Sequence, residues 1–144
     1  MRDLTSDQPG VEPKTLLVVD DTPENLTILG EMLMPRYRVR LASSGAQALM
    51  VARTHPLPDL ILLDVMMPDI DGYDVLERLQ NDKVTREIPV IFVTALDGIN
   101  DEARGLEMGA VDYILKPIKP AIVHARVHTH LELKEARDRL KDQN

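Results

Sequence analysis

The sequence predicts an α/β fold in which helices cover both faces of a doubly wound, five-stranded parallel sheet. Three observations support this class. Short apolar runs and segments with helical spacing alternate five times along the 144 residues, which is typical of strand–helix units. The first run, 15–19, is apolar throughout, as expected for a central strand covered by helices. Polar residues also follow four of the runs directly, and parallel strands all end at one edge of their sheet.

The first two strand–helix units occupy the chain as far as Pro56 and Pro58. After the strand at 15–19, we expect Thr22 to cap a helix that Pro35 ends. The second strand, 37–41, alternates apolar residues with arginines, so one of its faces is exposed to water and it lies at an edge. The small and hydroxylated residues at 43–45 begin the second helix.

The remaining three strands are expected at 60–63, 90–93 and 111–115. A loop rich in turn residues follows the third strand, and a helix then begins near Gly72. The fourth helix, 98–109, contains few apolar residues among many charges. Low apolar content implies loose attachment, so this helix is a candidate for movement.

From Pro120 the chain is expected to be helical almost to its end. One stripe with four-residue spacing is expected to pack on the sheet: Val123, Val127 and Leu131. A second stripe has the 3-4 spacing of a coiled coil and continues past the expected core: Arg126, Thr129, Leu133, Ala136 and Leu140. We therefore predict a flexible leader at 1–13, one domain at 14–133 and a C-terminal extension of the last helix at 134–144.

Composition narrows the classes of function. The formal net charge of −7 disfavours direct contact with nucleic acid and favours cations or basic partners. The absence of cysteine excludes disulfides and thiolate metal sites. The N-terminal residues contain no apolar signal core, and no apolar run approaches the roughly 18 residues that a membrane span needs. We expect a soluble, cytoplasmic protein without a membrane partner.

The candidate site consists of the polar residues that follow the apolar runs: Asp20, Asp21, Asp64, Thr94 and Lys116. Carboxylates crowded into one crevice repel one another, and a divalent cation such as Mg²⁺ relieves that repulsion through oxygen ligands. A carboxylate can also accept a phosphoryl group as a nucleophile, and Asp64 follows the most uniformly apolar strand. The hydroxyl and the ammonium could then hold phosphoryl oxygens. Taken singly, each aspartate could instead be a helix cap.

Four motifs together resemble the receiver domain of two-component response regulators: the residues 17–21, the segment 64–68 with Gly72, Thr94-Ala95, and Lys116-Pro117. The resemblance covers about 15–133. It implies a flavodoxin-like fold with strand order 2-1-3-4-5 and five helices. It also implies a regulatory domain, not an enzyme acting on separate substrates, that catalyses only its own phosphotransfer and dephosphorylation.

The resemblance further assigns roles to single residues. Mg²⁺ would bind at Asp20, Asp21, Asp64 and the backbone carbonyl of Met66. Asp64 would be the phosphoacceptor, with a phosphohistidine on a sensor histidine kinase or phosphotransfer protein as donor. The phosphoryl group would be held by Thr94, the backbone of Ala95, and Lys116. Tyr113 would be an aromatic switch that follows Thr94, and the Lys116–Pro117 peptide bond would be cis. The change would reach the face formed by the fourth helix, fifth strand and fifth helix.

The last helix resembles the segment that precedes cyclic-di-GMP phosphodiesterases of the HD-GYP type or related diguanylate cyclases, judged by residues 126–133. We therefore expect the chain to be the regulatory part of a larger response regulator with a downstream output domain. A stand-alone receiver is the alternative. The second stripe predicts a homodimer through this helix, but Arg126 and Thr129 weaken the stripe, so we expect dimerisation to depend on phosphorylation.

Three other functions fit the sequence less well. A metal-dependent phosphohydrolase would need a second acid two residues after Asp64, where Met66 stands. A docking receiver independent of phosphorylation is disfavoured because all the acidic and basic motif residues are present. A flavodoxin-type nucleotide binder is disfavoured because only 3% of the residues are aromatic, which leaves few rings to stack on a flavin.

Overall fold

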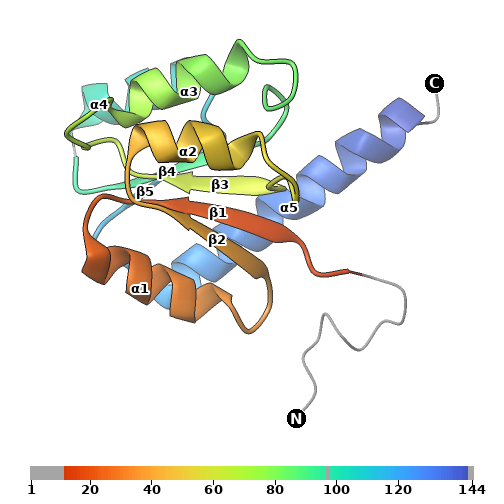
Figure 1. Ribbon diagram of the computed structural model, residues 1–144, viewed down its shortest axis with the longest axis horizontal. Coiled ribbons are helices and arrows are strands. Elements are labelled where there is room, and N and C mark those ends of the chain that lie inside the picture. The colour runs from red at the N-terminus through yellow and green to blue at the C-terminus, as the bar shows by residue number, and fades with distance from the viewer. Residues whose placement is uncertain (1–11, 97, 143–144) are drawn as a thin grey trace.

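The computed structural model describes residues 12–96 and 98–142, and it contains a five-stranded parallel sheet with the order β2-β1-β3-β4-β5 (Figure 1). This confirms the predicted fold class and strand order. The elements are β1 Thr15–Val19, α1 Pro23–Leu33, β2 Arg38–Ala42, α2 Gly45–Ala52, β3 Leu60–Leu63, α3 Gly72–Gln80, β4 Val90–Thr94, α4 Ile99–Glu107, β5 Asp112–Leu115 and α5 Pro120–Asp142. The expected leader lies almost entirely outside the described residues.

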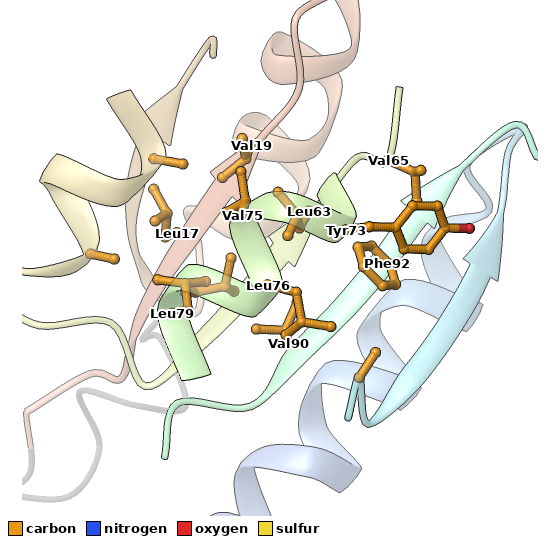
Figure 2. Packing of buried hydrophobic residues seen from close by; sticks show 14 of the residues in the cluster. Leu17, Val19, Leu63, Val65, Tyr73, Val75, Leu76, Leu79, Val90 and Phe92 are labelled. Carbon is orange, nitrogen blue, oxygen red and sulfur yellow. The ribbon is translucent and has the colours of Figure 1, made fainter. Parts of the chain in front are cut away.

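Two hydrophobic cores lie on opposite faces of the sheet. In β1, Leu17 and Val19 face the layer of α2 and α3, whereas Leu16 and Val18 face α1 and α5, because successive strand side chains alternate between faces. Figure 2 shows the first core, in which residues of α3 pack on those of β1, β3 and β4. Each central strand is therefore buried on both sides, which explains its continuous apolar sequence.

The register of the sheet brings the carboxyl ends of the strands together. Val19 at the end of β1 pairs with Ala42 of β2 and with Leu63 of β3. Thr94 at the end of β4 pairs with Leu115 of β5. The residues that immediately follow β1, β3 and β5 consequently lie along one edge of the sheet, as the sequence predicted.

The structure differs from the sequence prediction at several local points, and β2 and β4 each end one residue later than expected, at Ala42 and Thr94. Strand β2 begins one residue later than expected, because the Tyr37 N–H bonds to the Leu33 carbonyl in the turn after α1. Strand β5 likewise begins at Asp112. Thr22 precedes α1 as expected, but its side chain makes no capping hydrogen bond. Its N–H instead donates to Oδ1 of Asp20 at 2.9 Å.

The last two helices differ in how they are attached. In α4 the only buried residue is Gly105, in agreement with the low apolar content of this helix. In α5 the predicted stripe of Val123, Val127 and Leu131 is buried against the sheet. Beyond that stripe α5 projects past the sheet (Figure 1), and Arg137 still donates to the Glu87 carbonyl at 2.8 Å. Within the described part of the chain, no helix is long and apolar enough to cross a membrane.

Candidate functional site

Three carboxylates meet at the carboxyl edge of the sheet. Asp20 and Asp21 follow β1, and Asp64 follows the neighbouring strand β3. One oxygen from each of the three lies within 4.8 Å of the others. Asp20 and Asp64 are buried, whereas Asp21 is exposed. The cluster is therefore a set of hard oxygen donors that is open on one side, which suits an octahedral cation such as Mg²⁺.

Lys116 reaches into this cluster from the end of β5. Its Nζ atom lies 2.6 Å from Oδ2 of Asp20 and 3.2 Å from Oδ2 of Asp64. Its backbone N–H donates to the Thr94 carbonyl, which fixes its position beside β4. Burial alone would lower the pKa of the ammonium, but the hydrogen bonds and charges of the two carboxylates outweigh that effect and raise the pKa. Lys116 thus stays charged and offsets part of the carboxylate repulsion.

The Asp64 carboxyl has a raised pKa. Burial is the main cause and the neighbouring Asp20 carboxylate adds to it, while Lys116 and the Met66 N–H offset only part of the rise. The Met66 N–H donates to Oδ1 of Asp64 at 3.2 Å, and the Thr22 N–H donates to Asp20 in the same manner. Both aspartates therefore accept a hydrogen bond from the N–H two residues further on, and neither caps a helix, because Thr22 precedes α1 and Asp71 precedes α3.

The loop after Asp64 is fixed by two contacts that the sequence interpretation missed. The Gly72 N–H donates to the Val65 carbonyl, and a Cβ at position 72 would lie 2.4 Å from the Asp64 carbonyl oxygen, so only glycine fits. The Asp69 carboxylate accepts hydrogen bonds from the backbone of Gly45 and Ala46 at the start of α2. These backbone hydrogen bonds lower the pKa of Asp69. The D-x-D-G spacing in this loop was the available signal.

Thr94 is fully buried at the end of β4, and Ala95 after it is exposed. The Leu96 N–H points to Oγ1 of Thr94 at 3.4 Å, and the Leu96 carbonyl accepts a hydrogen bond from the Tyr113 hydroxyl at 2.7 Å. Residue Leu96 therefore joins the threonine to the tyrosine. The sequence offered no sign of this bridge, because it uses only backbone atoms of Leu96.

Tyr113 occupies the inward position. Its side chain is 7% exposed and packs edge-on against Phe92, with ring centroids 6.2 Å apart. The Lys116–Pro117 peptide bond is cis, and so is His55–Pro56. The structure thus brings Asp20, Asp21, Asp64 and Lys116 into direct proximity. Thr94 lies at the same edge of the sheet, and Tyr113 is linked to it through the Leu96 backbone.

The fold and this acidic edge match a known family. The family model for the response regulator receiver domain matches residues 16–128. The chain belongs to that family and is a receiver domain of two-component signalling.

Curated relatives agree with this assignment. The chain is 42% identical over 130 residues to a probable cyclic di-GMP phosphodiesterase of Vibrio cholerae, covering 90% of this chain and 29% of that protein. It is 45% identical over 127 residues to the response regulator PleD of Caulobacter vibrioides, covering 88% of this chain and 28% of that protein. The chain thus spans less than a third of the length of these two relatives.

Solved structures show the same fold. A putative response regulator from Chloroflexus aurantiacus superposes with a TM-score of 0.79 at 37% identity, covering 84% of this chain and 99% of that one. The BeF3-activated receiver domain of DrrB superposes with a TM-score of 0.76 at 32% identity, covering 84% of this chain and 99% of that one.

Proposed function

We propose that Asp64 accepts a phosphoryl group from a phosphohistidine on a sensor histidine kinase or phosphotransfer protein, and that this modification switches the domain. The observation that carries the proposal is the meeting of Asp64 with two further carboxylates and Lys116 at one edge of the sheet. The carboxylate oxygen of Asp64 attacks phosphorus, the phosphorus–nitrogen bond breaks, and the imidazole nitrogen leaves with its electron pair.

Different residues of the chain assist this transfer in different ways. Asp20, Asp21, Asp64 and the backbone carbonyl of Met66 would hold Mg²⁺, which supplies positive charge opposite the phosphoryl oxygens. Lys116 is charged and already within 3.2 Å of Asp64, so it can pair with a phosphoryl oxygen after transfer. The Thr94 hydroxyl and the Ala95 N–H supply neutral donors from the adjacent strand end.

The switch follows from the change in charge. A phosphoryl group brings nearly two negative charges into the site and draws the Thr94 hydroxyl towards it. Because Leu96 is hydrogen-bonded to both Thr94 and Tyr113, a shift of Thr94 alters the loop that leads into α4. The surface of α4, β5 and α5 can then move between two arrangements, for which a coupling of about 1–3 kcal/mol is enough.

The output is proposed to lie beyond α5. One relative is named as a probable cyclic di-GMP phosphodiesterase and the matched segment is only 29% of its length, so an output domain of that kind fits the continuing helix. On α5 the Leu133 and Leu140 side chains are 58% and 65% exposed, which supports a homodimer through the second stripe. The segment 134–144 would then be a signalling helix between receiver and output domain.

Intact-mass measurement after treatment with acetyl phosphate and Mg²⁺ tests the phosphoacceptor. We expect the wild type to gain one phosphoryl group and Asp64→Asn to gain none. Asp74→Asn is the matched control, because Asp74 is an exposed acid on the adjacent helix α3 and should leave labelling intact. Undiminished labelling of Asp64→Asn, or labelling that does not require Mg²⁺, would refute the assignment.

A further inference from the structure

Helix α4 rests on a row of three aromatic rings from three different elements. Tyr73 of α3 packs edge-on against Phe92 of β4 with centroids 5.5 Å apart, and Phe92 packs edge-on against Tyr113 of β5. Figure 2 shows Tyr73 beside Phe92 in this core. A Cβ on Gly105 would lie only 2.9 Å from the Phe92 ring, so the α4 backbone lies directly on the middle ring. Because few contacts hold the helix, the loss of any one of them is expected to affect the position of α4.

Tyr73 contacts a single turn of α4. Its hydroxyl donates to the Asp101 carbonyl at 3.1 Å, and the Arg104 guanidinium lies 4.0 Å above its ring centre. Asp101 and Arg104 are three residues apart and thus lie on the same face of the helix. The Tyr73 side chain is 4% exposed, so its own position is set by the core beneath it. This arrangement joins a rigid part of the domain to the weakly packed helix.

Tyr113 makes the corresponding contact on the other side of Phe92. Its hydroxyl donates to the carbonyl of Leu96, in the loop that precedes α4. The two tyrosine hydroxyls therefore hold the loop and the first turn of α4 from opposite sides. Among the described residues, Leu96 links the Tyr113 side of this pair to Thr94.

The Tyr73 contact also borders the phosphoacceptor site. A cleft of about 640 Å³ is lined by Tyr73, Asp101 and Arg104 together with Asp21 and Met66. A displacement of α4 away from Tyr73 would change the width of this cleft. The position of the helix is thus connected to the immediate surroundings of the acidic cluster.

We propose that Tyr73 is a positioning residue of the switch. Its hydroxyl bond to Asp101 and its ring contact with Arg104 hold α4 in the seated arrangement, and breaking this contact is part of the energetic cost of moving α4 when Asp64 is phosphorylated. The claim that this contact opposes the movement of α4 on phosphorylation rests on the proposed function. The claim that Tyr73 holds α4 in place concerns the unphosphorylated protein alone and can be tested without a phosphodonor.

Hydrogen exchange of the α4 amides in the untreated protein tests the contact. We expect Tyr73→Phe, which keeps the ring and removes the hydroxyl, to speed exchange across 99–107 by about 3- to 10-fold, the factor expected from losing one typical hydrogen bond. Because one hydrogen bond is lost from the folded state, the thermal midpoint should fall by only a few degrees, and exchange of the α1 and α2 amides that open locally should stay as in the wild type. Tyr37→Phe is the matched control, because Tyr37 packs on the opposite core and should leave α4 unchanged.

Labelling kinetics test the link to the switch. Because Tyr73→Phe lowers the cost of moving α4, it should be labelled faster by limiting acetyl phosphate with Mg²⁺ than the wild type, while Tyr37→Phe should match the wild type. Exchange of α4 unchanged in Tyr73→Phe, acceleration spread over the whole domain, or a slower or unchanged labelling rate would overturn the inference. A wild type that is not labelled at Asp64 would refute the proposed function, and the exchange measurement would still decide whether Tyr73 holds α4.

Discussion

The Nζ atom of Lys116 lies 3.2 Å from Oδ2 of Asp64, and the two residues are 52 positions apart in the sequence. The same ammonium lies 2.6 Å from Asp20. It therefore occupies the position between two carboxylates where positive charge is needed most. This relationship makes the lysine and a bound cation partial substitutes for each other in neutralising the cluster.

Replacing Lys116 by alanine should lower the stability of the Mg²⁺-free protein and raise its affinity for Mg²⁺. Without Mg²⁺ the variant leaves buried carboxylates unpaired, and we expect the free energy of unfolding to fall by about 2–4 kcal/mol. With the ammonium gone, Mg²⁺ should bind more tightly and recover most of that loss. Urea unfolding with and without Mg²⁺, together with calorimetric titration, measures both effects.

The control for this variant is Lys119→Ala, which removes an exposed lysine from the next loop. It should change neither quantity by more than about 0.5 kcal/mol. Mg²⁺ affinity that is equal or weaker in Lys116→Ala would contradict the electrostatic account. Labelling of Lys116→Ala by acetyl phosphate should persist, but α4 exchange should no longer respond to it.

Gly105→Ala should loosen α4 even though alanine favours helix. In an exposed helix interior the change would stabilise by about 1 kcal/mol. Here the new Cβ would lie 2.9 Å from the fully buried Phe92 ring, and such overpacking costs about 1–3 kcal/mol. We expect net loss, seen as faster hydrogen exchange confined to α4.

Gly30→Ala in α1 provides the matched comparison. Its Cβ would find no atom closer than 3.6 Å among the neighbours described, so it should stabilise the protein by about 0.5–1 kcal/mol. If the two variants changed stability and α4 hydrogen exchange equally, the close contact between Gly105 and Phe92 would not determine the position of α4.

The sequence was sufficient to predict the sheet and the acidic cluster because both depend on short-range pattern. Each apolar run marks the position of one strand. Because parallel strands end at one edge of the sheet, the residues that follow these runs lie together: Asp20, Asp21, Asp64 and Lys116. The buried stripe of α5 follows equally from its spacing. The strand ends were less predictable, since Tyr37 belongs to a turn that only the hydrogen bond to Leu33 defines.

The low apolar content of α4 predicted its loose attachment, but the particular contacts that attach it could not be predicted from sequence for a physical reason. Its buried contact is made by Gly105, which contributes no apolar side chain to a periodic pattern. The groups that hold it come from beneath, from Tyr73 and Tyr113, and they bond to backbone carbonyls that every residue carries. Such contacts depend on where the helix crosses the sheet, and that position is a property of the tertiary structure.

Asp112 should stabilise the domain in a pH-dependent manner. It joins β5 to α5, because its carboxylate lies 3.0 Å from Nε2 of His130 and accepts a hydrogen bond from Arg126 at 2.8 Å. Burial would raise the pKa of this carboxyl, but the hydrogen bonds from His130, the Tyr113 N–H and Arg126 outweigh it and lower the pKa. The stabilisation is therefore present above the ordinary pKa of 3.8 and is lost as the pH falls through the lower value in the folded protein.

The variant Asp112→Asn measures this effect. At pH 7 we expect its free energy of unfolding to be about 1–2 kcal/mol below that of the wild type. The difference should shrink as the pH falls below the ordinary carboxyl value. Urea unfolding across an acid pH series checks both points, and a difference that stays constant with pH would contradict the charged hydrogen bonds as its source.

Leu133→Glu should abolish the proposed homodimer. Leu133 is 58% exposed on α5, while Lys134 beside it faces the domain and pairs with Asp59 at 3.8 Å. Leu133 and Leu140 are both exposed to solvent in the single chain, so they are available to a second copy. We expect light scattering to report a dimer for the phosphorylated wild type and a monomer for Leu133→Glu. Met50→Glu, the same change at a 64% exposed site on α2, should remain dimeric.

A phosphorylated wild type that is monomeric at high concentration, or a Leu133→Glu variant that still dimerises, would exclude this stripe as the interface. The reason is that a buried glutamate pair at the centre of the stripe would cost far more than a typical coiled-coil contact provides.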